Sequence, residues 1–174
     1  CDTAYTWNGT EKRNLLGADE VDAMLLELVQ FQPSRHGLVL TGGEPLLYMD
    51  NEDLLHVLEY SQWAWRSLET SGYIRLPRNV LERNAKVNSA FAFMFLFDYI
   101  SISPKITKCL PGKQTEDEAF AAIDAMIPLL RGYCPEKITF KFVCKDEDDI
   151  RTVLKLADYR DYRGEFRVDI MPYG

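Results

Sequence analysis

Polar side chains that could bind a small ligand stand directly after three stretches predicted to be β-strands. A glycine-rich turn, TGGEP at 41–45, follows the strand predicted at 37–41, and the sequence SPK at 103–105 closes the strand predicted at 99–103. The two glycines let a ligand approach the backbone, and Glu44 offers a carboxylate to an ammonium group. Lys105 is able to pair with a carboxylate, and Ser103 adds a hydrogen bond. These residue types indicate binding of a zwitterionic ligand.

A third polar group, ETSG at 69–72, closes the strand predicted at 67–71, and Glu69 there could accept the two hydroxyls of a ribose. Together the three strand ends supply an ammonium acceptor, a carboxylate partner and a diol acceptor. S-adenosylmethionine, an amino acid joined to a ribose, requires all three. Each feature also has an ordinary structural interpretation: a tight turn, a solvated Lys105 after a proline, and Glu69 in a structural ion pair.

Helix and strand signals alternate along the chain. Apolar residues recur at three- and four-residue spacing in four segments, 18–31, 51–65, 115–130 and 146–157. Asn51 is a plausible N-cap, Thr115 with Glu118 forms a capping-box pattern, and the acidic run at 146–149 suits a helix N-terminus. Strands are predicted at 37–41, 67–71, 99–103, 137–143 and 166–171. This alternation favours βα units and a parallel sheet.

The predicted strands alternate between apolar and polar residues, whereas parallel strands covered on both sides are apolar throughout. Ile138, Phe140 and Phe142 alternate with Thr139 and Lys141, and the other strands repeat the pattern. A sheet curled around a polar lumen with helices outside, a complete or partial (β/α) barrel, explains this best. The alternative is a sheet whose edge strands are wetted by solvent. In a barrel the chemistry belongs at the C-terminal strand ends.

The composition narrows the class of protein. The chain has 174 residues and a formal charge of −7, which argues against a broad interface with DNA or tRNA. It contains no run of 18 apolar residues and no signal-peptide pattern, so we expect a single soluble, cytoplasmic domain over 1–174 and no membrane contact. The apolar run at 90–97 fits either a buried helix segment or a partner surface.

The four cysteines do not form a metal-binding motif by spacing. We expect Cys109, Cys134 and Cys144 to be buried or half-buried reduced thiols. Cys1 differs because nothing precedes it in the sequence, so any motif that included it would extend upstream.

The motifs together resemble the radical S-adenosylmethionine enzymes of the 7-carboxy-7-deazaguanine synthase family. The resemblance rests on CDT at 1–3, the turn at 41–45, the ETSG sequence at 69–72 and SPK at 103–105, in this order and spacing. It spans nearly the whole chain and implies a partial (β/α)6 barrel of the radical S-adenosylmethionine type. The Gly-Gly-Glu turn is general to that superfamily, and its combination with CDT at 1–3 and SPK at 103–105 is narrower.

The resemblance implies roles for single residues. Cys1 would be the last of three cysteines that hold a 4Fe–4S cluster, and Thr3 would bind Mg²⁺. S-adenosylmethionine would contact residues of the motifs at 41–45, 69–72 and 103–105 and, by a looser match, two residues after the strand predicted at 137–143. These residues are Gly43, Glu44, Glu69, Ser71, Ser103, Lys105, Lys145 and Asp146. Thr41 and Pro172 would line the substrate. The other two cluster cysteines and the first strand would precede Cys1.

The resemblance also implies the reaction and its partners. 6-Carboxy-5,6,7,8-tetrahydropterin would undergo radical ring contraction to 7-carboxy-7-deazaguanine with loss of ammonia, a step of queuosine and deazapurine biosynthesis. A one-electron donor such as a flavodoxin would reduce the cluster, and a homodimer is compatible with the sequence.

Three alternatives remain open at this level. Another radical enzyme, such as a glycyl-radical activase, would share the Gly-Gly-Glu turn. A barrel enzyme without a cluster would use the glycines for a phosphate. A non-catalytic remnant or interaction module would present the run at 90–97 to a partner.

Overall fold

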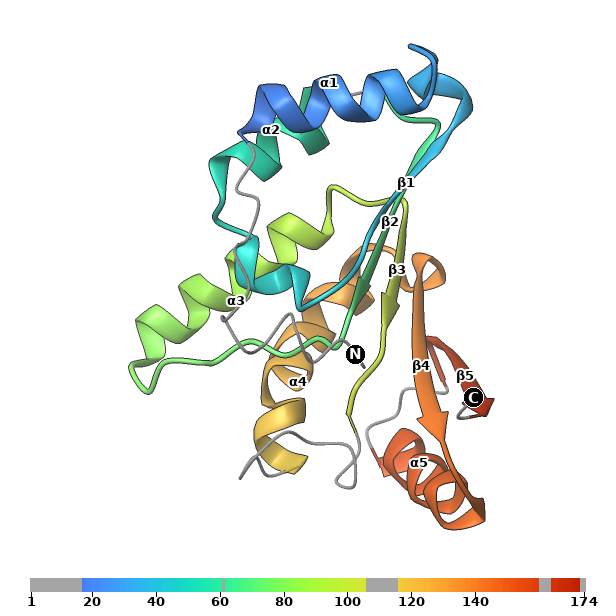
Figure 1. The fold of residues 1–174 in the computed structure, drawn as a ribbon. Helices are drawn as coiled ribbons and strands as arrows, with labels where there is room; N and C mark the ends of the chain where they lie inside the picture. Colours follow the sequence, from blue (N-terminus) through green and yellow to red (C-terminus); the bar gives the residue numbers. More distant parts are fainter. Residues whose placement is uncertain (1–16, 61, 106–115, 160–163, 173–174) are drawn as a thin grey trace, which may run out of the picture.

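The structure is a computed structural model that describes residues 17–60, 62–105, 116–159 and 164–172. It is an α/β fold in which helices and strands alternate (Figure 1). The helices are α1 (Ala18–Leu28), α2 (Glu52–Tyr60), α3 (Val80–Met94), α4 (Glu116–Tyr133) and α5 (Glu147–Tyr159), with short 3-10 turns η2 (Pro33–Arg35), η3 (Pro45–Tyr48) and η5 (Pro135–Lys137). The strands are β1 (Gly37–Leu40), β2 (Trp65–Thr70), β3 (Tyr99–Ile102), β4 (Ile138–Cys144) and β5 (Arg167–Pro172).

The five strands form one parallel sheet in the order β1-β2-β3-β4-β5, as the alternation of helix and strand predicts. Each predicted strand lies within two residues of an observed one. All strands run in the same direction, so their C-terminal ends meet at one edge of the sheet (Figure 1).

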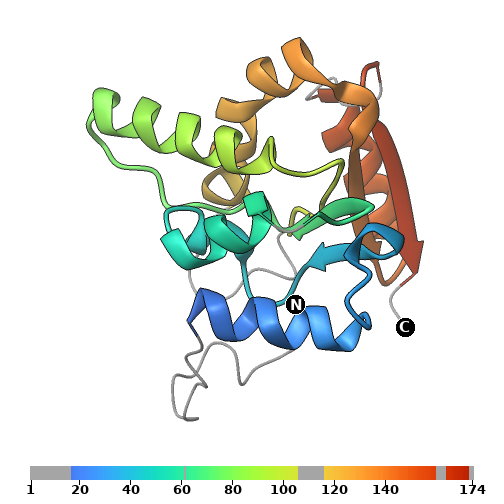
Figure 2. The same ribbon diagram turned by 90° about the horizontal axis from the view of Figure 1, so that it is seen from above.

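One face of the sheet carries the hydrophobic core, and the predicted alternation is confirmed by burial. Seen from above, α2, α3 and α4 follow one another around one side of the strands (Figure 2). A single cluster of buried residues joins helices α2 to α5 to alternate strand residues: Leu58, Phe93, Ile123 and Val153 from the helices, and Leu68, Ile100, Ile102, Phe140 and Phe142 from the strands. The residues between them on the strands are half-buried or exposed, so the helices cover one face.

Two predicted helices are longer than the observed ones. The first ends at Leu28 because Gln30 and Phe31 take left-handed backbone conformations, with φ of 53° and 58°. The second prediction included Trp65, which is wrong, since Trp65 begins β2. Where a cap can be checked, the prediction is confirmed: the Asn51 side chain accepts a hydrogen bond from the Leu54 N–H at 2.8 Å. The capping pattern predicted at Thr115 lies outside the described residues.

The sequence does not predict helix α3 as a whole, although residues 90–94 of the apolar run at 90–97 form its C-terminal end. Ala90, Phe93, Met94 and Phe97 are buried, whereas Phe95 is 48% exposed. The interpretation as a buried helix segment is therefore correct for one face of the run, and four of its eight residues are buried. The missed N-terminal signal is Asn79, whose side chain accepts hydrogen bonds from two N–H groups of the first turn.

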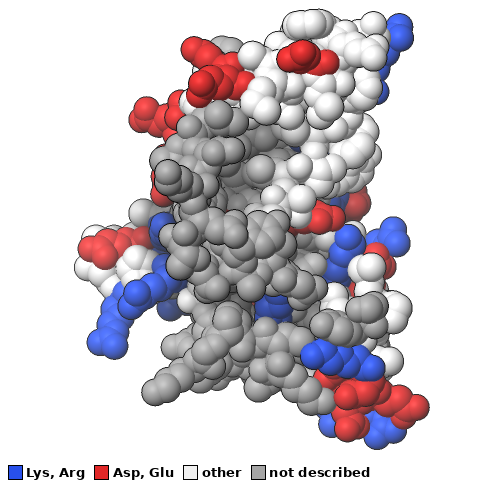
Figure 3. All heavy atoms as spheres, viewed as in Figure 1, with Lys and Arg blue, Asp and Glu red and all other residues white. Residues whose placement is uncertain are grey.

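Helix α1 lies at one end of the molecule and contributes no buried residue to the core. Its exposed residues include Met24 and Leu28, and its first turn carries Asp19 and Glu20. Figure 3 shows acidic side chains gathered at the upper left, at the end of the molecule where α1 lies. Across the described part of the chain, no helix combines the length and apolarity that crossing a bilayer requires.

Candidate functional site

The polar face is the side of the sheet turned away from the core cluster. The alternate residues that form it come from all five strands and the residues that directly follow them: Thr41, Glu69, Ser71, Ser101, Ser103, Thr139, Lys141, Arg167 and Asp169. The register places Glu69, Ser101, Thr139 and Arg167 in one row across the sheet. Predicted ligand-binding residues from separate strands therefore share one surface.

Two features of the backbone shape the strand ends. Gly42 and Gly43 have φ of 85° and 60°, which side-chain-bearing residues rarely adopt, and no neighbouring atom fills the space where a Cβ would stand. Gly72 has φ of 74°, and a Cβ there would lie 2.7 Å from the Ile123 side chain. The glycines are therefore required by the turns, and the backbone at Gly42 and Gly43 is open to approach.

Glu44, predicted to meet an ammonium group, is 5% exposed, and its carboxylate accepts four hydrogen bonds. Oε1 accepts from the Leu46 N–H at 3.1 Å and from the Thr70 hydroxyl. Oε2 accepts from the Ser71 N–H at 2.9 Å and from the Ser71 hydroxyl. Thr70 and Ser71 in turn accept from the N–H groups of Gly72 and Tyr73. The carboxylate thus caps η3 and ties the β1 turn to the end of β2.

Glu69 lies on the polar face and makes fewer contacts. Its Oε2 accepts a hydrogen bond from the Thr41 hydroxyl at 3.0 Å, and its Oε1 lies 3.6 Å from the Lys141 Nζ. The Glu69 side chain is 47% exposed. An ionised carboxylate has about four acceptor positions, so Glu69 keeps capacity to accept hydrogen bonds from a ligand.

The structure brings Ser103 next to the end of β2. Its N–H donates to the Thr70 carbonyl at 2.7 Å, which extends the pairing of β2 and β3 by one step. Ser71 and Ser103, both predicted to contact the cofactor, are half-buried, and so is Lys105. Glu69, Ser71 and Ser103 thus stand on adjacent strand ends, as the sequence predicts.

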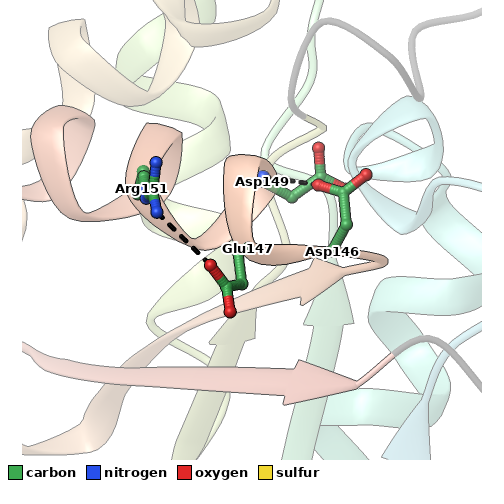
Figure 4. Close-up of polar contacts among 4 residues, drawn as sticks. All are labelled: Asp146, Glu147, Asp149 and Arg151. Carbon is green, nitrogen blue, oxygen red and sulfur yellow. Dashed lines mark hydrogen bonds and ion pairs between the residues drawn. The ribbon is translucent and has the colours of Figure 1, made fainter.

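Lys145 and Asp146 directly precede α5. Asp146 Oδ1 accepts from the Asp149 N–H at 2.9 Å (Figure 4). In return, Asp149 Oδ2 accepts from the Lys145 N–H at 3.0 Å, which makes the capping reciprocal. Glu147 and Arg151 add an exposed ion pair on the first turn (Figure 4). These contacts explain both acidic side chains as helix caps. The predicted cofactor contacts of Lys145 and Asp146 stay predictions.

The end of β5 places Pro172, which is predicted to line the substrate, and the preceding Met171 on different faces. Met171 pairs in register with Val143 on the side of the polar face, whereas Pro172 pairs with Cys144, which is buried in the core. Both are exposed at the edge of the sheet. On the same strand, the hydrogen bond and the charge of Asp169 raise the pKa of the Arg167 guanidinium, which stays positively charged.

The predicted metal ligands Cys1 and Thr3 lie outside the described residues, and so does Cys109. Of the other cysteines, Cys134 is half-buried and Cys144 is buried, and both are reduced thiols, as predicted. Residues 17–60, 62–105, 116–159 and 164–172 bring no three His, Cys, Asp or Glu side chains together as a metal site.

Three residues of this region were not nominated as site residues from the sequence. Thr70 and Lys141 bind the two carboxylates, and the Ser101 Oγ is buried with no hydrogen-bond partner in the described part of the chain. The available signal was the polar residue at every second position of β3 and β4. That pattern identifies a face, whereas the partner of each side chain depends on the neighbouring strands.

In comparisons with known proteins, no family model, curated protein or solved structure matches this chain.

Proposed function

We propose that this chain is a radical S-adenosylmethionine lyase that converts 6-carboxy-5,6,7,8-tetrahydropterin to 7-carboxy-7-deazaguanine with loss of ammonia. In this proposal the parallel sheet is part of a (β/α)6 barrel, with the polar face lining its lumen and the helices outside. The observation that supports it best is the gathering of Thr41, Glu69, Ser101 and Lys141, from four successive strands, on one face near the C-terminal strand ends. Parallel α/β enzymes bind their ligands at this edge.

The polar face suits a zwitterionic nucleoside in its donor and acceptor types. Glu69 has free acceptor positions, Lys105 supplies a cation, and Ser101 has a buried hydroxyl oxygen without a partner in the described residues. Glu44 fits a different role from the predicted one, because four donors already fill its carboxylate. We therefore assign Glu44 to hold the turn and the Gly43 backbone to meet the ligand ammonium.

The residues that would hold the inorganic groups have suitable chemistry. A thiolate such as that of Cys1 is the usual ligand of an iron–sulfur cluster, and the hydroxyl oxygen of Thr3 suits Mg²⁺. S-adenosylmethionine on a reduced 4Fe–4S cluster supplies the radical that starts the ring contraction. The chain itself binds and orients the two ligands: Glu69 accepts the ribose hydroxyls, Ser103 and Lys105 hold the amino-acid end, and Thr41 stands at the substrate edge.

The test uses the protein encoded by the full reading frame, reconstituted anaerobically with iron and sulfide. We expect a brown protein with iron–sulfur absorption. Supplied with a one-electron reductant and S-adenosylmethionine, it should form 7-carboxy-7-deazaguanine from the pterin, detected by mass spectrometry. Glu69→Gln is expected to lower product formation, while Glu59→Gln, on the exposed surface of α2, serves as the matched control.

Two results would contradict the proposal in different ways. A protein that binds no cluster is not a radical enzyme of this type, and the phosphate-binding barrel or non-catalytic module then becomes the better interpretation. A protein that binds the cluster and cleaves S-adenosylmethionine without converting the pterin belongs to another reaction class, such as a glycyl-radical activase.

A further inference from the structure

The ion pair between Lys141 and Glu69 crosses a whole strand. Glu69 is on β2 and Lys141 is on β4, and β3 lies between these strands in the sheet. The carboxylate and the ammonium nevertheless approach to 3.6 Å. Ser101 of β3 is the register partner of Glu69 and of Thr139, two residues before Lys141. The two charged side chains therefore meet over the part of β3 that carries Ser101.

The other carboxylate beside Lys141 is already engaged. Asp169 on β5 is the register partner of Lys141, and its Oδ1 accepts a hydrogen bond from the Arg167 Nε at 2.9 Å. Lys141 is thus paired across the sheet with Glu69. At 3.6 Å this pair is longer than a charge-assisted hydrogen bond of about 2.7–2.9 Å. The attraction holds both groups in place without consuming the three donors of the ammonium.

Ser101 adds a hydroxyl at the same place. Its Oγ is buried, and the described part of the chain offers it no hydrogen-bond partner. Burying a hydroxyl without a partner is unfavourable, so such a group in a candidate site indicates a position where a ligand atom completes the hydrogen bonding. The site then contains a carboxylate that accepts, an ammonium that donates, and a hydroxyl that does both.

We propose that Lys141 and Ser101 complete a binding site for the cis-diol of a ribose and that Lys141 is a specificity-determining residue. Each hydroxyl of a diol has one proton to donate and an oxygen that accepts. Glu69 accepts the two protons, and Lys141 and Ser101 donate to the two oxygens, so all hydrogen-bonding groups are satisfied. This inference rests on the proposed function, in which the ribose belongs to S-adenosylmethionine.

The experiment measures the affinity of the reconstituted protein for S-adenosylhomocysteine and for its analogue that lacks both ribose hydroxyls, by anaerobic titration calorimetry. We expect Lys141→Met to weaken binding of S-adenosylhomocysteine about tenfold or more, because a hydrogen bond from a charged donor is lost. The same substitution should leave the affinity for the dideoxy analogue unchanged within about twofold. Ser101→Ala should weaken binding of the ribose ligand by a few-fold, again without affecting the analogue.

Two variants serve as controls. Lys86→Met removes a lysine on α3 that pairs with Asp50 at 4.0 Å, away from the polar face, and should bind both ligands as the wild type does. Lys141→Arg keeps the charge and the donors and should recover most of the affinity. Thermal melting of each variant shows whether it is folded, and Ser101→Ala, the smaller change, provides the same comparison if Lys141→Met does not fold.

The outcomes separate the two proposals. If Lys141→Met weakens the binding of both ligands equally, or of neither, the assignment of Lys141 is wrong, while the proposal that the protein binds S-adenosylmethionine stands. If the wild-type protein binds neither ligand, the diol site and the proposed function are both wrong.

Discussion

The two faces of the sheet treat their polar groups in opposite ways. On the side of the helices, Thr70 and Leu46 are buried, and together with Ser71, which follows Thr70 on the polar face, they fill the carboxylate of Glu44 with four hydrogen bonds. On the polar face, Glu69, the residue before Thr70, has one hydrogen bond and one longer ion pair. Two glutamates at neighbouring strand ends therefore differ in how much of their binding capacity the protein itself uses.

This difference separates structure from function within one site. A buried carboxylate with every acceptor position filled stabilises the fold and has nothing left to offer a ligand. A half-exposed carboxylate with free positions adds little to stability and is ready to bind. The polar face is thus the part of the molecule whose residues are available for chemistry, and the opposite face keeps them in position. Three predictions test this division.

The largest effect is expected from the core side of β4. Phe140 is fully buried and its ring lies 5.4 Å from that of Phe166. Phe140→Ala should lower the free energy of unfolding by about 3–5 kcal/mol, because it removes buried surface and leaves a cavity. Thr139→Ala, the preceding residue on the polar face, should change it by less than about 1 kcal/mol. Urea denaturation measures both changes. An equal loss of unfolding free energy in the two variants would show that the two faces are packed alike.

An intermediate effect is expected at Glu44. Glu44→Gln keeps the size of the side chain but replaces one oxygen by an NH₂ group, which then faces two donors. Hydroxyls of Thr70 or Ser71 can rotate away, whereas the N–H groups of Leu46 and Ser71 cannot. We expect the free energy of unfolding to fall by about 2–4 kcal/mol, measured by urea denaturation. A neutral result would mean that the network is replaceable and that Glu44 is free to bind a ligand.

Much of the framework was predictable because it depends on local sequence. The strands were found from the alternation of apolar and polar residues, which burial on one face imposes directly. The sequence does not predict helix α3 because the helical spacing of its apolar residues is hard to recognise. One of its buried residues is the small Ala90, and its first turn carries two exposed apolar residues, Val80 and Leu81, at 68% and 79% exposure. Trp65 was assigned to a helix because a large apolar residue fits either pattern, and only its pairing with Gly37 of β1 decides for the strand.

The site was predictable as a set of residues but not as a set of roles. Glu44 and Glu69 each follow or end a strand, and nothing in their local sequence distinguishes them. The distinction arises from which donors the fold brings to each carboxylate, and for Glu44 these come from Thr70 and Ser71 on another strand. Likewise, Lys141 was recognised as part of a polar face, but its approach to Glu69 crosses β3 and depends on the sheet.

The smallest effect on stability is expected at Glu69, with the same substitution as at Glu44 as its matched control. Glu69→Gln keeps an oxygen that accepts from Thr41 and loses the attraction to Lys141, on side chains that are 47% and 32% exposed. Exposed ion pairs contribute about 0.2–1 kcal/mol, so the free energy of unfolding should fall by less than about 1 kcal/mol. Urea denaturation in low and high salt should show a loss that shrinks as salt screens the charges. If Glu69→Gln is as costly as Glu44→Gln, the polar face is itself a structural network, and its side chains are not held ready for a ligand.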